Sequence, residues 1–134
     1  MKLYQTLLDG NKKWVQKRLE KDPDYFKNLS QGQNPQFLWI ACSDSRVPAS
    51  EITNTHPRVI FVHRNIANMV VHSDMNLLSV LDYAVNILKV KHVIVCGHYG
   101  CGGVKAAMGN EQYGLVDNWL RFIKDVYRMR RQEL

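Results

Sequence analysis

Phe37-Leu-Trp-Ile-Ala-Cys42 is a short apolar run between a turn-forming segment, residues 31–35, and a polar segment that begins at Ser43. Such a run is typical of a strand buried on both faces. Two similar runs follow at residues 59–63 and 92–97, and between them apolar residues at helical spacing predict a core-facing helix over residues 74–90. Strands that alternate with helices predict an α/β fold, with a central, mostly parallel sheet flanked by helices.

The segments outside this centre predict further helices. Apolar residues at helical spacing predict an amphipathic helix over residues 2–20, and Pro23 is expected at the first position of a short helix that ends near Ser30. Helices are also predicted over residues 101–108 and 115–130. No linker or repeat divides the 134 residues. We therefore expect a single domain over residues 1–134, with an N-terminal helical arm over about 1–31 and an α/β core over about 36–134.

The formal net charge of +6 is confined to the two ends of the chain. Residues 1–30 hold seven Lys and Arg against four Asp and Glu, residues 121–134 hold five against two, and residues 31–120 hold six against six. The excess therefore lies on segments that are predicted to be amphipathic helices. A solvated helix face explains it better than a phosphate-binding patch, so we expect no nucleic-acid partner.

Three cysteines, Cys42, Cys96 and Cys101, lie in apolar or glycine-rich segments. An odd number placed in this way does not indicate a disulfide framework, and we expect reduced thiols. No segment is long and apolar enough for a membrane span, and the N-terminus does not resemble a signal peptide. These features predict a cytoplasmic protein that has no membrane partner. Cys96, inside the third strand, is expected to be a core thiol.

Cys42, His98 and Cys101 follow the carboxyl ends of two predicted strands. Ligands of open parallel sheets gather at that edge, so adjacent strands would bring the three side chains together. Two thiolates and one imidazole form a set that Zn²⁺ prefers, and three protein ligands with one open position are typical of a catalytic site. A short Cys/His pair alone would be weak evidence, but Asp44 and Arg46 stand directly after Cys42.

Three motifs are similar to those of the β-class carbonic anhydrases: residues 42–47 (CSDSRV), 63–68 (HRNIAN) and 97–103 (GHYGCGG). The resemblance covers nearly the whole chain and implies reversible, zinc-dependent hydration of carbon dioxide to bicarbonate. It implies that Cys42, His98 and Cys101 hold one Zn²⁺ per chain. It also implies an Asp44–Arg46 dyad, in which Arg46 holds the carboxylate off the metal. In some members that aspartate becomes a fourth ligand in a closed state.

The same resemblance implies a substrate cleft and a homo-oligomer, either a dimer or a tetramer. The matching cleft positions are Gln33, Phe61, Ile66 and Tyr83, and Gln33 is expected to reach across a dimer interface. The backbone N–H of Gly102 is expected to support bound bicarbonate. Carbon dioxide is apolar, so Phe61 and Ile66 suit the wall of such a cleft.

Two further implications concern the periphery of the fold. Trp39 and Arg64 match two positions of a non-catalytic bicarbonate site found in one subgroup, and a core tryptophan and a structural arginine explain them equally well. Relatives continue past the position of Leu134 with additional strands. We therefore expect the β-carbonic anhydrase fold without its C-terminal strands, with an apolar edge at the third strand.

Two other functions are compatible with the residues. The chain could be a catalytically weak, zinc-binding remnant that serves as an interaction or regulatory subunit. It could also be a thiol enzyme with Cys42 as nucleophile, although the Cys-to-Arg spacing is too short for the phosphate loop of cysteine phosphatases. Zinc content and carbon dioxide hydration together distinguish these hypotheses.

Overall fold

The computed structural model describes residues 2–133, which form two compact units that divide between Gln33 and Asn34. The first unit contains α1 (Leu3–Lys21) and α2 (Tyr25–Ser30). Pro23 lies in the turn between these helices, so its predicted place inside α2 is wrong. Aromatic contacts join the helices, with the ring centroids of Trp14 and Phe26 5.3 Å apart. No described residue of α1 is buried, and its apolar side chains are largely exposed.

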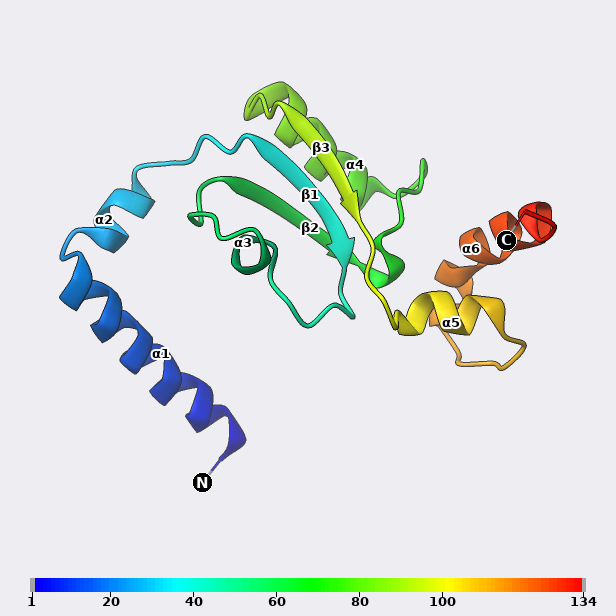
Figure 1. The fold of residues 1–134 in the computed structure, drawn as a ribbon, viewed down its shortest axis with the longest axis horizontal. Helices are drawn as coiled ribbons and strands as arrows, with labels where there is room; N and C mark the ends of the chain where they lie inside the picture. The colour runs from blue at the N-terminus through cyan, green and yellow to red at the C-terminus, as the bar shows by residue number, and fades with distance from the viewer. Residues whose placement is uncertain (1, 134) are drawn as a thin grey trace. The chain divides into compact units, whose positions relative to one another are not determined.

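The second unit contains a three-stranded sheet in the order β2-β1-β3, which confirms the predicted parallel α/β fold (Figure 1). The strands are β1 (Phe37–Cys42), β2 (Ile60–Asn65) and β3 (His92–Cys96). The middle strand β1 is the most buried, and Leu38, Ile40 and Cys42 are at most 2% exposed. The carboxyl end of β1 is therefore enclosed by its neighbours.

One core cluster covers the face of the sheet that carries Leu38 and Ile40. It includes Leu77 of α4 (Met75–Asp82) and Ala84 of the π-helical turn η2 (Tyr83–Ile87). A single helix was predicted over residues 74–90, but the α-helix ends at Asp82. The N–H of Leu88 then donates to the carbonyl of Tyr83, five residues back, which widens the last turn.

A second core cluster lies at the carboxyl end of β1. Its buried members are Cys42, Ala67, Met69, Val71 and Cys101. Residues from two helices and a 3₁₀ turn surround it: α5 (Gly102–Met108), α6 (Val116–Arg130) and η1 (Ile66–Asn68). Leu120 of α6 is 1% exposed, so this helix has a buried face within the unit. The short helix α3 (Ala49–Ile52) and η1 were not predicted.

The edge strand β3 is open to solvent. Val93 and Val95 are about half exposed, and Cys96 is only partly buried and belongs to neither core cluster. The prediction of Cys96 as a core thiol is therefore wrong, because it lies on an edge strand.

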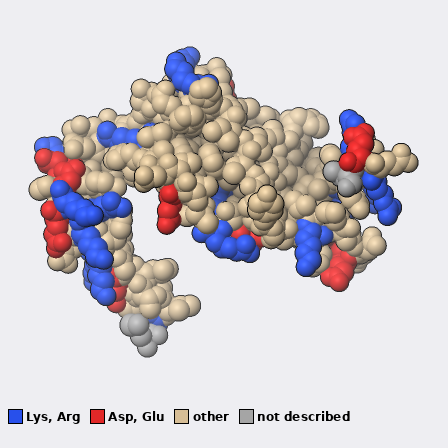
Figure 2. Space-filling view, in the orientation of Figure 1, with Lys and Arg blue, Asp and Glu red and all other residues tan. Residues whose placement is uncertain are grey.

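None of the described helices is long and apolar enough to cross a membrane. Lys and Arg are interspersed with Asp and Glu on α1 and at the C-terminal end (Figure 2).

Gly103 permits the close approach of α5 to η1. A Cβ atom at this position would lie 2.7 Å from Cγ2 of Ile66 and 3.2 Å from Cβ of Ala67. We therefore expect Gly103→Ala to lower the free energy of unfolding by roughly 1–3 kcal/mol. Gly109→Ala is the control, because a Cβ there would make contacts of 3.7–3.8 Å at the end of the same helix. Denaturant unfolding measures both, and equal stability of the two variants would contradict the packing argument.

Candidate metal centre

The backbone forms a tight turn around the sulfur of Cys42, directly after the end of β1. The N–H of Asp44 donates to Cys42 Sγ at 3.3 Å, and the N–H of Ser45 donates to the Cys42 carbonyl at 3.2 Å. Arg64 of β2 donates through Nε to the same carbonyl at 2.9 Å, and through Nη2 to the carbonyl of Ser45. Backbone and arginine together fix the position of this thiol.

The loop from Asn65 to Met69 brings a second N–H to the same sulfur. The Asn65 carboxamide closes the loop on Met69, accepting from its N–H at 2.7 Å and donating to its carbonyl at 2.8 Å. Inside the loop, Ala67 has a φ of 68°, in the left-handed region that alanine rarely adopts. Its N–H donates to Cys42 Sγ at 3.1 Å. The sulfur therefore accepts from two backbone donors.

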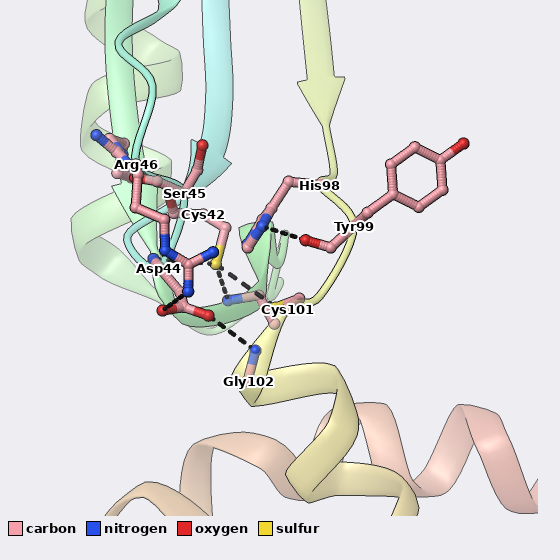
Figure 3. Close-up of polar contacts among 10 residues, drawn as sticks. Cys42, Asp44, Ser45, Arg46, His98, Tyr99, Cys101 and Gly102 are labelled. Carbon is pink, nitrogen blue, oxygen red and sulfur yellow. Dashed lines mark hydrogen bonds and ion pairs between the residues drawn. The ribbon is translucent and has the colours of Figure 1, made fainter.

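His98 and Cys101 reach Cys42 from the segment that follows β3 (Figure 3). Gly100, with a φ of 67°, turns the chain between them, and Cys101 is the N-cap residue of α5. The sulfurs of Cys42 and Cys101 lie 3.7 Å apart. One donor atom from each of Cys42, His98 and Cys101 lies within 4.8 Å of the others. The predicted group of three thus converges at one point.

Electrostatics distinguish the two thiols. Burial opposes ionisation of Cys42, but hydrogen bonds to its sulfur, among them those from the N–H groups of Asp44 and Ala67, outweigh it and lower the pKa of Cys42 to about 7. Burial dominates at Cys101, and the adjacent Cys42 sulfur adds to it, so the pKa of Cys101 is raised. Cys42 is therefore the first of the pair to become a thiolate.

The donor set fits a tetrahedral metal ion. His98 Nδ1 lies 3.0 Å from the Tyr99 carbonyl, which can only accept, so Nδ1 carries the proton and Nε2 is left with a lone pair. His98 Nε2 is buried without a hydrogen-bond partner, as expected for an atom that binds a metal. Two sulfurs and one imidazole nitrogen are ligands that Zn²⁺ prefers, and a four-coordinate ion held by these three would need one further ligand.

A carboxylate is held beside this group. Asp44 accepts from the N–H of Gly102 at 2.8 Å through one oxygen, and its other oxygen lies 3.6 Å from Arg46 Nη2 (Figure 3). The N–H of Gly102 is the main cause that lowers the pKa of Asp44, with charge contributions from Arg46 and His98. The carboxylate is therefore ionised at neutral pH, and its two oxygens are held by Gly102 and Arg46. Asp44 is not among the three donors that converge.

Comparison with known proteins identifies the family. The family model described as "Carbonic anhydrase" matches residues 37–134. A curated carbonic anhydrase of Emericella nidulans is 49% identical over 131 residues, which is 98% of this chain. The chain belongs to the β-carbonic anhydrase family. It spans 58% of the length of the Emericella relative and 44% of a Candida albicans carbonic anhydrase.

Solved β-carbonic anhydrases share this fold. A structure described as one of two tetrameric β-carbonic anhydrases from Sordaria macrospora has a TM-score of 0.92 at 41% identity, covering 97% of this chain and 66% of that one. A Coccomyxa β-carbonic anhydrase in complex with acetazolamide has a TM-score of 0.91 at 36% identity and covers all of this chain and 61% of that one.

The residues that match the family's substrate cleft separate into groups. Ile66 and Gly102 line a cleft of about 570 Å³ together with Asp44. Phe61 and Tyr83 contact each other instead, with ring centroids 5.8 Å apart. Phe61 packs against the core cluster that contains Leu38 and Leu77. Gln33 is exposed at the end of the first unit, and its role across a dimer interface stays a prediction.

Trp39 and Arg64 lie on the face of the sheet opposite the one that carries Leu38 and Ile40. Both line a cavity of about 390 Å³, together with Cys96. The Arg64 guanidinium also binds the carbonyls of Cys42 and Ser45. This contact supports the structural explanation for Arg64, and the bicarbonate site stays a prediction.

Sequence reasoning missed the residues that support Cys42 from outside the ligand set. Asn65 and Ala67 lie within the quoted motif of residues 63–68, but the motif did not indicate that this loop donates to the sulfur. Asn68 was a usable signal, because asparagine is common where a chain adopts left-handed backbone, and its φ is 43°. Trp119 lies in the helix predicted over residues 115–130, but nothing in the sequence indicated that its indole N–H donates to the carbonyl of Ile66, at 2.7 Å.

We predict that in the metal-free protein one thiol ionises with a midpoint near pH 7, the value to which the pKa of Cys42 is lowered. This pKa lies below that of an unfolded thiol, about 8.5, so ionisation stabilises the fold. The stabilisation is complete above about pH 8.5 and is lost as the pH falls through 7. Ultraviolet absorbance of the thiolate measures the midpoint. Cys42→Ser should remove the ionisation near pH 7, and Cys96→Ser should keep it. If that ionisation remained in Cys42→Ser, it could not belong to Cys42.

Proposed function

We propose that the protein is a zinc-dependent carbonic anhydrase that interconverts carbon dioxide and bicarbonate. The observation that carries this proposal is the buried, unpartnered Nε2 of His98 beside the Cys42 and Cys101 sulfurs. These three side chains would hold one Zn²⁺ per chain. Membership of the β-carbonic anhydrase family supports the reaction.

The zinc ion, when bound, supplies a Lewis acid that generates a hydroxide nucleophile near neutral pH. The chain's residues supply orientation and charge. Asp44 is an ionised acceptor beside the three proposed ligands, and it could accept a hydrogen bond from a water molecule there. Arg46 and the N–H of Gly102 hold the two carboxylate oxygens and so restrict where Asp44 points. A turn of this carboxylate toward the metal would give the closed state that the family resemblance implies.

The cleft beside Asp44 suits an apolar substrate and an anionic product. Ile66 offers an apolar wall, and Gly102 offers a backbone N–H at the start of α5. In this structure that N–H donates to Asp44, so bicarbonate could use it only after the carboxylate moves. The family resemblance also assigns Phe61, Tyr83 and, across a dimer interface, Gln33 to substrate binding.

We further propose that the active protein is a homo-oligomer in a reducing, cytoplasmic compartment. The first unit exposes apolar side chains of α1, including Leu3 at 86% and Leu7 at 74%, as expected of a surface that a second copy covers. The Sordaria relative is described as tetrameric. Cys42, Cys96 and Cys101 are free, and a reducing compartment preserves the thiolates that a metal requires.

Zinc stoichiometry and hydration of carbon dioxide test the function together. We expect one zinc per chain and measurable hydration in the unaltered protein. Cys101→Ser should lose the metal and the activity, because two protein ligands hold zinc far more weakly than three. Cys96→Ser should retain both. Equal zinc content in the two variants would overturn the ligand set, and zinc without hydration would leave a metal-binding protein that is not an enzyme.

Arg46→Ala tests the dyad. Without the guanidinium, Asp44 loses one of its two anchors and can turn toward the metal, so hydration should fall by about tenfold while zinc stays bound. Arg130→Ala is a matched control, because it removes an exposed ion pair with Glu133 at 2.8 Å, away from the described ligand cluster. Stopped-flow hydration assays and zinc analysis measure both variants. Unchanged hydration in Arg46→Ala would remove Arg46 from the mechanism.

A further inference from the structure

One peptide group connects helix α6 to the sulfur of Cys42. Its carbonyl belongs to Ile66 and accepts from the indole Nε1–H of Trp119 at 2.7 Å. Its N–H belongs to Ala67 and donates to Cys42 Sγ at 3.1 Å. Because a peptide group is planar, fixing its oxygen also fixes the direction of its N–H. The indole therefore controls where the Ala67 N–H points.

The two hydrogen bonds also act on each other. A donor on the carbonyl oxygen polarises the peptide and makes its N–H a stronger donor, which is the cooperative effect expected of hydrogen-bond chains in a protein interior. Cys42 is fully buried, and Trp119 and Ile66 pack against the core cluster that contains it. Solvent does not compete for this sulfur.

The backbone of the loop does not adopt this arrangement by intrinsic preference. Ala67 and Asn68 both have positive φ, at 68° and 43°, and left-handed backbone is unfavourable for alanine. The Asn65 carboxamide closes the loop, but both of its hydrogen bonds go to Met69. Trp119 supplies the side-chain contact that holds the Ile66–Ala67 peptide itself.

We propose that Trp119 is a positioning residue for the metal centre, acting through the Ile66–Ala67 peptide on the sulfur of Cys42. A hydrogen bond to a thiolate withdraws electron density from sulfur and orients its lone pairs toward the metal. The inference rests on the proposed zinc site and adds a residue from α6, outside the ligand-bearing segments. It assigns Trp119 a role in metal affinity beyond its role in packing.

The test compares Trp119→Phe with Ile123→Val in the full chain. Trp119→Phe keeps an aromatic ring and removes the indole donor, whereas Ile123→Val trims the same core cluster without touching the hydrogen bond. Chelator competition should give a zinc dissociation constant about tenfold higher in Trp119→Phe, as is typical of outer-shell changes. The cobalt-substituted variant should absorb at longer wavelength in its sulfur-to-metal charge-transfer band. Ile123→Val should lower stability and leave both readouts unchanged.

The unaltered protein provides a test that does not depend on a variant folding. With cadmium-113 in the site, the Ala67 amide proton should couple to the metal through the Cys42 sulfur. The indole proton of Trp119 should exchange with solvent more slowly than that of Trp14, whose side chain is 43% exposed. Missing coupling, fast indole exchange, or equal effects of the two variants would overturn the proposal. Failure of the unaltered protein to bind zinc at all would instead refute the proposed function and, with it, this inference.

Discussion

The proposed metal centre depends on two backbone N–H groups that point at one buried sulfur. A thiolate without hydrogen bonds is costly to bury, and Cys42 is fully buried. The N–H of Asp44 comes from the turn after β1, and the N–H of Ala67 comes from the loop after β2. Both strands must therefore end at the same level, which their parallel register, with Cys42 opposite Asn65, ensures.

The third strand completes the centre because β1 lies between β2 and β3. His98 and Cys101 follow β3, so the segments that follow all three strands meet at one edge. Asp44 then connects the turn after β1 to the first residue of α5 through the N–H of Gly102. This bond positions the start of α5 relative to the ligands, and Gly103, the next residue, has no side chain to keep α5 away from η1.

The features predicted from sequence were those encoded within a short segment. The apolar run of residues 37–42 fixed the bounds of β1, and residue type and spacing indicated Cys42, His98 and Cys101 before their convergence was known. The left-handed Ala67 could not be predicted in this way, because alanine has no intrinsic preference for that backbone. The same limit applies to Arg64 and Trp119, whose hydrogen bonds join residues 22 and 53 positions apart.

The three proposed metal ligands and the Asp44–Arg46 pair differ in how firmly they are held. Arg46 is 73% exposed, and a contact of 3.6 Å with Asp44 at such a site is weak and screened by salt. The N–H of Gly102 is therefore the stronger restraint on Asp44, in agreement with its being the main cause that lowers the pKa of that carboxyl. Under the proposed function, bicarbonate requires this same N–H. Product binding and the orientation of Asp44 are then coupled, because one donor cannot serve both anions fully. Under the same proposal, the buried thiolates would keep the metal in place while this half-buried carboxylate moved.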